Sequence, residues 1–430
     1  MKKSWKIFLI VGLGILLAVG FRFWQIRKGA RPNIVLIVID CLRADHLPFY
    51  GYHKNTAPFL SELAAQSVIF KRAYSASTIT SAAMASLFTS AYPFQHHFCY
   101  NTFGAGYNDI YVNSIPEEAP LLAEFLRGQG YRCFGIPDNA HVHEKTGFAR
   151  GFSQYQNSSY RGVKYVMRSL ETWWFKIVHP ATPYFLYIHF MDPHLPYHAR
   201  LPWYQENGYA DMAAYDSEIN YLDVHFQRLF YDFGWDKNTL LIVTADHGEE
   251  FREHSHRGHG INLYNPTLRI PLMFYYPGRF APALVDPGPV TSVDIFPTIR
   301  DLLGAGSDPR LEGLSLLPAI KGEKIPGQED RYLFGHLSSL RKKKFHPPLR
   351  SVIQGDWKLI RTDKGSELYD LSHDPGEKDN LAGLRPDRLQ HLSSVLDDFL
   401  ANSHKYKPAF VEIHPDEDQE EQLRSLGYLQ

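Results

Sequence analysis

Four short apolar runs, the first of them continuous and β-branched, constrain the fold of this chain most strongly. They occupy residues 34–39, 184–190, 239–244 and 271–276. Runs of this kind are typical of strands buried on both faces, as in a parallel sheet. Helical patterns separate them, for example at 57–67 and at 120–129, where Gly130 supplies a stop signal. The alternation predicts an α/β fold, with a doubly wound, mixed but mostly parallel sheet flanked by helices.

Three of these runs are followed by side chains that can bind a cation. Asp40 follows the first run, Asp192 and His194 follow the second, and Asp246 with His247 follow the third. Ligands of open α/β sheets bind beyond the carboxyl ends of the strands, so we expect one polar site there. A carboxylate and an imidazole side by side suit a divalent metal of intermediate softness. The alternative reading is that the aspartates cap helices and the histidine is a hydrogen-bonded loop residue.

Length and composition limit the classes of protein to which the chain can belong. Its 430 residues allow one large α/β domain with a small appendage, or two ordinary domains. The 45 basic and 46 acidic side chains lack the basic excess of a nucleic-acid-binding protein, so no nucleic-acid partner is expected. Three cysteines are too few, and odd in number, for a disulfide framework.

Three regions are expected along the chain. Residues 1–30 form an N-terminal membrane anchor or signal peptide, and residues 31–335 form the catalytic domain. Residues 336–430 form a C-terminal subdomain with short antiparallel strands and a tail helix, since short alternating patterns follow a charged loop there.

The N-terminal segment predicts export. Basic residues precede an apolar run at 7–21, which is nearer to a signal-peptide core than to the ~20 residues of a full membrane span. An aromatic and basic stretch at 21–28 follows it and favours an uncleaved anchor over a cleaved signal. We therefore expect a membrane-anchored protein whose catalytic domain is extracytoplasmic (periplasmic or extracellular), or a secreted one if the signal is cleaved.

A hydroxyl-rich segment at 75–90 is the candidate source of a nucleophile. It places Ser77, Thr78, Thr80 and Ser81 before a helix-compatible stretch. A hydroxyl at a helix N-terminus lies in a positive field near free backbone N–H groups, which favours an alkoxide and an anionic substrate. Plain N-capping is the alternative, and composition does not choose among the four residues.

Histidines are concentrated between residues 247 and 259. The segment contains His247, His254, His256 and His259. Such side chains ligate metals, donate to anionic oxygens or protonate leaving groups. Surface histidines in a solvated loop are the alternative for His254 and His256.

Taken together, these segments resemble the sulfatase family in the broad sense, the alkaline-phosphatase superfamily. Residues 33–47 resemble its opening pattern "NIVLIxxDtlRaDhl". Further resemblances lie at 85–90, at 191–197 ("mDPHxPY"), at 244–249 ("TaDHGE"), at 259–272 ("HGxxLYxxxxrvPl") and at 367–377.

The resemblance implies a metal-dependent site. By it, Asp40, Asp246 and His247 hold one divalent metal ion, with the nucleophile as a further ligand. Counting back from residues 85–87 places Thr80 at the nucleophile position.

The same resemblance implies how the substrate is held. His194 and His259 fall where the family binds substrate oxygens or assists the leaving group, and Asn101 falls near a further substrate-binding position. The expected partner is an anionic ester substrate, with a glycan or a lipid headgroup as the candidate carrier. The oligomeric state is not predicted.

The chain departs from the family pattern at its nucleophile. Formylglycine-dependent sulfatases carry Cys or Ser in a C/S-x-P/A-x-R context, whereas this segment begins with Thr80 and has Met84 at the arginine position. Threonine cannot become formylglycine, so the resemblance is to the threonine-nucleophile branches that act on phosphodiesters and phosphoryl groups. Cys41 stands where sulfatases often place another aspartate. A metal site with one carboxylate fewer and with His247 as a ligand favours Mn²⁺ or Zn²⁺ over Ca²⁺.

The sequence thus predicts a hydrolase that cleaves phosphate, phosphonate or sulfate esters through a covalent Thr80 intermediate. Two alternatives stay open. One is a membrane-anchored transferase that moves a phosphoryl-alcohol group, such as phosphoethanolamine, onto a glycan or lipid. The other is a non-catalytic binding protein on the same fold.

Overall fold

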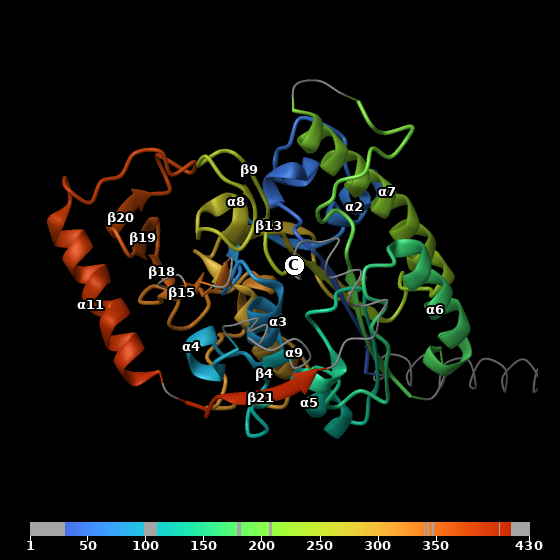
Figure 1. Cartoon of the computed structure of the whole chain (residues 1–430). Helices are drawn as coiled ribbons and strands as arrows, with labels where there is room; N and C mark the ends of the chain where they lie inside the picture. The colour runs from blue at the N-terminus through green and yellow to red at the C-terminus, as the bar shows by residue number, and fades with distance from the viewer. Residues whose placement is uncertain are drawn as a thin grey trace, which may run out of the picture.

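The fold is described from a computed structural model of the chain (Figure 1). The residues that the structure describes are 31–98, 110–178, 182–205, 209–338, 340–341, 344–345, 348–403 and 405–413. Asn101 and the N-terminal segment 1–30 lie outside them.

A mixed, mostly parallel sheet forms the centre of the molecule. Its strand order is β13-β2-β12-β8-β1-β7-β5-β6. In chain order the strands are β1 (Asn33–Ile39), β2 (Val68–Phe70), β5 (Arg132–Pro137), β6 (Gln154–Tyr155), β7 (Tyr184–Phe190), β8 (Thr239–Thr244), β12 (Leu272–Tyr275) and β13 (Ala283–Val285). The predicted fold class is confirmed.

Strand β1 lies in the middle of this sheet, with parallel neighbours on both sides. Ile34 pairs with Phe185 of β7 and with Leu240 of β8. All of β1 after Asn33 is buried, as are β7 and β8 throughout. Apolar β-branched side chains suit strands covered on both faces, which explains why the uninterrupted runs became the central strands. Strand β12 is antiparallel to β8, so the sheet is mixed.

Helices cover both sides of the sheet (Figure 1). On one side α6 contacts α7, β5 and β7, and α2 packs on α7. On the other side α3 contacts α5 and α9. The main helices are α2 (Pro58–Ala64), α3 (Thr80–Thr89), α5 (Leu122–Gly128), α6 (Val163–Ile177), α7 (Ala210–Asp232) and α9 (Ile295–Leu302).

Shorter elements complete the described chain. The helices are η1 (Ala44–His46), η2 (Pro48–Tyr50), α4 (Pro93–His96), η3 (Glu144–Thr146), α8 (Asn265–Leu268), η4 (Ser292–Asp294) and α10 (Leu317–Ile320). The strands are β3 (Ala73–Tyr74), β4 (Ile110–Ser114), β9 (Glu250–Phe251), β10 (Arg257–Gly258), β11 (Arg269–Ile270), β14 (Val290–Thr291), β16 (Leu340–Arg341), β17 (Lys344–Phe345) and β21 (Ala409–Ile413).

The C-terminal part forms a small antiparallel sheet covered by one helix. Its strands, in the order β15-β18-β19-β20, are β15 (Leu333–Leu337), β18 (Leu349–Gln354), β19 (Trp357–Thr362) and β20 (Gly365–Asp370). Helix α11 (Pro386–Asn402) buries Leu392 and Leu396 against this sheet. The predicted subdomain with short antiparallel strands and a tail helix is therefore present. Strand β15 runs across the boundary expected between residues 335 and 336. The positions of the domain boundaries stay a prediction.

The expectation of a membrane-anchored protein needs correction. No helix in the described part of the chain is long and apolar enough to cross a membrane. The longest described helix, α7, has 23 residues but buries Asp216, Glu218 and Asp223, whereas a spanning helix needs about 20 predominantly apolar residues. The segment 1–30, in which the anchor was expected, lies outside the described residues. Membrane anchoring is not supported.

Candidate active site

Four adjacent parallel strands, β8-β1-β7-β5, bring polar side chains to one edge of the sheet. Asp40 follows β1, while Asp246 and His247 follow β8. Asn139 follows β5 and His189 is the penultimate residue of β7. All five side chains are at most 1% exposed. Because the strands are parallel, their carboxyl ends meet at the same edge, as the sequence predicted.

Thr80 lies at the centre of this group. It is the first residue of α3 and is 3% exposed. Its Oγ1 lies 3.2 Å from Nε2 of His247 and 3.4 Å from Nδ2 of Asn139. The ten-residue helix α3 directs its N-terminal N–H groups toward the same edge, and such a helix end favours negative charge. The structure therefore brings the predicted hydroxyl beside the predicted imidazole.

Asp40 and Asp246 form a pair of buried carboxylates joined by histidines. Nε2 of His189 lies 3.3 Å from Oδ2 of Asp40 and 3.9 Å from Oδ2 of Asp246. Nε2 of His247 lies 3.3 Å from the same Asp246 oxygen. Oδ2 of Asp246 is buried with no hydrogen-bond partner among the described residues. Two buried carboxylates with an unsatisfied oxygen need a positive charge, so these residues fit a divalent cation.

Hydrogen bonds fix the ring of His247 in the form that a metal requires. Its Nδ1 lies 2.9 Å from the carbonyl oxygen of Gly248 and donates to it. The lone pair is therefore on Nε2, which faces Asp246 and Thr80. Metal-binding histidines are held in this way by a bond from the other ring nitrogen. The donor set of two carboxylates, one imidazole and one hydroxyl suits Mn²⁺ or Zn²⁺.

Asn139 ties Asp40 to Thr80. Its Nδ2 donates to Oδ2 of Asp40 at 2.6 Å and also approaches the Thr80 hydroxyl. Burial opposes ionisation of Asp40, but the contacts with His189 and other nearby histidines hold the pKa of Asp40 well below its usual range. The Asp40 carboxylate is thus charged and available to a cation.

His194 and His259 lie beside this cluster. Their ring centroids are 4.9 Å apart, and the ring of His259 lies 4.5 Å from that of His247. Nδ1 of His259 is 3.1 Å from Oε1 of the buried Glu249. Burial lowers the pKa of His259, but Glu249 more than compensates and raises it to about 9. His259 can therefore carry a proton, whereas burial lowers the pKa of His194.

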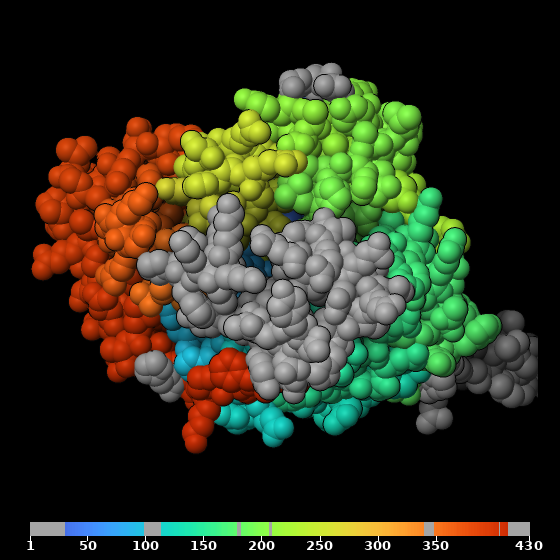
Figure 2. Space-filling view, viewed as in Figure 1, coloured from blue at the N-terminus to red at the C-terminus, as the bar shows by residue number. Residues whose placement is uncertain are grey.

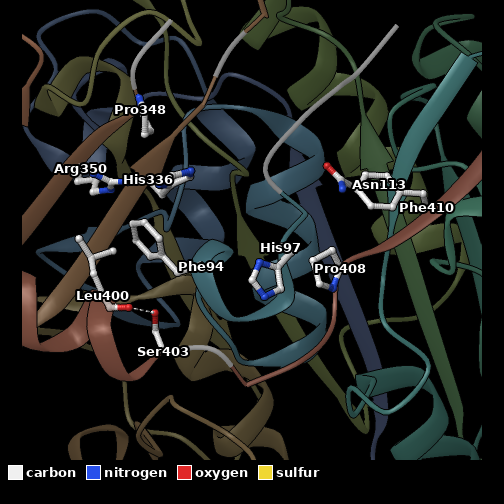
Figure 3. Close-up of a pocket in the computed structure, with 10 residues that line it drawn as sticks. All are labelled: Phe94, His97, Asn113, His336, Pro348, Arg350, Leu400, Ser403, Pro408 and Phe410. Carbon is white, nitrogen blue, oxygen red and sulfur yellow. Dashed lines mark hydrogen bonds between the residues drawn. The ribbon is translucent and has the colours of Figure 1, made fainter. Parts of the chain in front are cut away.

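A hollow opens on the face of the molecule shown in Figure 2. Blue atoms from the first part of the chain are visible at its floor, between yellow and green segments. Figure 3 shows a separate pocket of about 490 Å³, lined by α4, β15, β18 and the β4–β21 ribbon. Its lining includes His336 and Arg350 but none of the predicted site residues. The carboxylate cluster and this pocket are distinct features.

The structure brings together most of the residues that the sequence singled out. Nε2 of His247 lies 3.2 Å from Oγ1 of Thr80, 3.3 Å from Oδ2 of Asp246 and 4.0 Å from Oδ1 of Asp40, while Asn101 lies outside the described part of the chain. The roles assigned to these residues stay predictions.

Sequence reasoning missed Asn139, His189 and Glu249. His189 is a lone histidine inside an otherwise apolar and aromatic run, and Asn139 stands two residues after an apolar strand. Both were visible signals of a strand-end site. Glu249 has a weaker signal, since it stands two residues after the predicted metal ligand His247.

Comparison with known proteins gives the family. The sulfatase family model matches residues 32–305, and the model described as "N-sulphoglucosamine sulphohydrolase, C-terminal" matches residues 258–405. The Delta 4,5-hexuronate-2-O-sulfatase of Bacteroides thetaiotaomicron is 21% identical, over 90% of this chain and 92% of that protein. Human arylsulfatase A is 25% identical, over 85% of this chain and 87% of that protein.

Solved structures have the same fold. A putative sulfatase from Bacteroides thetaiotaomicron superimposes with a TM-score of 0.72 and 21% identity, over 87% of this chain and 93% of the other. The phosphonate monoester hydrolase of Agrobacterium radiobacter superimposes with a TM-score of 0.71 and 20% identity. The match covers 90% of this chain and 100% of that protein. With the family model matching well over half of the chain, and its strand-end cluster in place, the protein belongs to the sulfatase family and is an ester hydrolase.

Proposed function

We propose that this protein hydrolyses an anionic sulfate, phosphate or phosphonate ester, with Thr80 as nucleophile and a divalent cation held by Asp40, Asp246 and His247. The observation that carries the proposal is the position of the Thr80 hydroxyl. It lies at a helix N-terminus, 3.2 Å from Nε2 of His247, in a site with two buried carboxylates, of which Asp246 has an oxygen without a hydrogen-bond partner among the described residues.

The residues around Thr80 support a nucleophilic role. Asn139 donates toward Oγ1, and the hydroxyl faces Nε2 of His247. A cation bound by that Nε2 lone pair would lower the pKa of the hydroxyl, whose proton would leave to solvent, and would neutralise charge on the ester oxygens. Thr80 Oγ1 then attacks sulfur or phosphorus in line and forms a covalent ester, while the bond to the leaving oxygen breaks.

His194 and His259 complete the proposed reaction. His259, which Glu249 keeps protonated, donates its proton to the leaving oxygen. His194 contacts an oxygen of the transferred group. Water then attacks the Thr80 ester and regenerates the hydroxyl.

The chemical class of the ester is proposed from the nucleophile. Thr80 cannot become formylglycine, and the position of the usual arginine is Met84, which is fully buried. Similar folds occur in a phosphonate monoester hydrolase and in sulfatases. One relative is a hexuronate-2-O-sulfatase. On that basis, a glycan is the proposed carrier of the ester group.

The test is turnover by the full chain with Mn²⁺, Zn²⁺ or Ca²⁺ on an aryl sulfate, a phosphate monoester, a phosphate diester and a phosphonate monoester. Thr80→Ala should lose activity, and Thr80→Ser, which keeps a hydroxyl, should retain much of it. Wild-type activity in Thr80→Ala would show that another group attacks. Sulfate turnover alone, lost in Thr80→Ala, would narrow the proposal to sulfate esters.

A further inference from the structure

The pocket of Figure 3 lies where the C-terminal sheet meets the rest of the chain. Figure 3 shows His336 and Arg350, from β15 and β18, on one side of it, and Asn113 with Phe410, from β4 and β21, on the other. Its volume of about 490 Å³ falls within the range of small-molecule sites, roughly 300–1,000 Å³. Elements that are distant in sequence thus surround a space large enough for one sugar ring.

His336 is a buried residue at the wall of this pocket, and its ring has an unsatisfied nitrogen. The residue is 4% exposed, and its Nε2 lies 2.7 Å from Oγ of Ser338. Nδ1 is buried and has no hydrogen-bond partner in the described part of the chain. Burial and the nearby Arg350 lower the pKa of His336 to about 3, so the ring is neutral and Nδ1 is either a donor or an acceptor. A sugar hydroxyl, which both donates and accepts, can satisfy Nδ1 in either state.

Arg350 gives the pocket a positive charge. It is the cross-strand partner of His336, and its guanidinium carbon lies 5.8 Å from the centre of the Phe94 ring. No aspartate or glutamate is among the described residues that line the pocket, and the nearby Asp397 is paired with Arg361. A guanidinium has five N–H donors, so Arg350 can keep its present contacts and still bind an anionic group.

Apolar side chains make up half of the ten residues that line the pocket, namely Phe94, Pro348, Leu400, Pro408 and Phe410. The ring of Phe94 packs edge-on against that of His336, with centroids 4.3 Å apart. Phe410 is 59% exposed, so its ring is available to a ligand. The C–H face of a pyranose is apolar and packs on such rings, while its edge carries hydroxyls. Apolar walls with a few polar groups that fix orientation are typical of small-molecule sites.

We propose that this pocket is a non-catalytic binding site for one acidic sugar unit, which carries a carboxylate or a sulfate. The anionic group pairs with Arg350, and a ring hydroxyl bonds to Nδ1 of His336. The apolar face of the sugar packs against Phe94 and Phe410. No covalent bond forms or breaks in the pocket.

The backbone connects this pocket to the segment that carries Thr80. The N–H of His336 donates to the carbonyl oxygen of Ala76 at 3.0 Å, and Ala76 belongs to the hydroxyl-rich segment that leads into Thr80. The inference rests on the proposed function in one respect, which is that the substrate is a glycan. The pocket then holds a second unit of the chain whose ester is cleaved.

The test measures sugar binding to the full chain, freed of metal with a chelator so that no ester is turned over. The probes are methyl glucuronide and methyl glucoside 6-sulfate, with neutral methyl glucoside and benzoate for comparison, and NMR titration gives each Kd. We expect at least one acidic sugar to bind about tenfold or more tightly than methyl glucoside, because only the acids engage the guanidinium. Affinities equal to that of methyl glucoside would overturn the proposal, as would tighter binding of benzoate.

Variants of the lining residues locate the binding. Arg350→Ala should weaken binding of the acidic sugar about tenfold or more. Arg388→Ala is the matched control, since it removes the same charge from α11, where Arg388 packs on Trp357 outside the pocket, and should change nothing. Phe410→Ala removes an exposed side chain without disturbing the core and should weaken binding of acidic and neutral sugars alike. Unchanged binding in both Arg350→Ala and Phe410→Ala would overturn the proposal.

A variant of the active site separates this inference from the proposed reaction. His259→Ala removes the proposed proton donor, so it should lose turnover and keep the affinity for the acidic sugar. Binding that is lost in His259→Ala but kept in Arg350→Ala would place the sugar at the active site and overturn the proposal. The binding measurement needs no turnover, so failure of the proposed reaction and failure of the sugar site give different results.

Discussion

The C-terminal sheet and the edge of the central sheet both bury charged side chains, but only the C-terminal group pairs a lysine with a carboxylate. In the C-terminal sheet, Nζ of Lys358 lies 2.6 Å from Oε1 of Glu377, and both side chains are 0% exposed. Asn265 of α8 completes the group, because its Oδ1 accepts from Lys358 and its N–H donates to Oε2 of Glu377. At the edge of the central sheet, Asp40 and Asp246 are buried as deeply, yet within the described ranges neither forms an ion pair with Lys or Arg.

The difference separates a structural group from a functional one. The buried ion pair joins Lys358 of β19 to Glu377, which follows β20, and Asn265 links both to α8. Two buried carboxylates without a permanent cation destabilise the fold unless an external cation joins them. Asp40 and Asp246 form such a pair at the ends of β1 and β8.

Breaking the C-terminal pair should have the largest effect on stability. Lys358→Met leaves the charge of Glu377 buried and unpaired, and should lower the free energy of unfolding by about 3–5 kcal/mol. Urea denaturation measures this. As a control on the same sheet, Arg361→Ala breaks a partly exposed pair with Asp397 and should cost less than about 1 kcal/mol. Equal losses in the two variants would contradict the comparison.

Removing one charge from the carboxylate cluster should affect activity instead. Asp246→Asn keeps an oxygen that can accept the N–H of His247 but removes the charge. Turnover should fall by roughly 10²–10³-fold. The free energy of unfolding of the metal-free protein should stay the same or rise. A loss of stability like that of Lys358→Met would mean that the carboxylate is structural.

Metal should stabilise the wild type through the same cluster. At about a hundredfold excess over its Kd, a cation adds roughly 2.7 kcal/mol to the free energy of unfolding. Thermal unfolding with and without chelator measures the increment for Zn²⁺ and Mn²⁺. The increment should be smaller in Asp246→Asn and unchanged in Arg361→Ala. An equal shift in both variants would indicate binding elsewhere.

Loss of the amide between Asp40 and Thr80 should have the smallest effect. Asn139→Ala removes a residue that orients a proposed ligand and the proposed nucleophile, so turnover should fall about 10–100-fold, with metal still bound. Asn220→Ala is the control, since Asn220 donates to the carbonyl of Asn55 away from the cluster. Unchanged kcat in Asn139→Ala would show that Thr80 is positioned without it.

Much of the fold was predictable because burial on both faces demands uninterrupted apolar runs. The runs at 184–190 and 239–244 became β7 and β8 with the same bounds, and Asp246 stood where a strand end was expected. Choosing Thr80 from its neighbouring hydroxyls needed the family resemblance, since every hydroxyl near a helix start has the same local chemistry. The membrane anchor was predicted from a segment that lies outside the described residues.

The sequence by itself determined which side chains stand at strand ends, because that depends only on the order of residues along the chain. The tertiary structure decided which strand ends are neighbours. The order β8-β1-β7-β5 places Asp246, Asp40, His189 and Asn139 side by side although they are distant in sequence. It also placed the thiol of Cys41, a residue with a left-handed backbone, 3.1 Å from Asp40 and 3.4 Å from His259. Strand order and backbone handedness depend on packing of the whole sheet, so no local pattern could supply them.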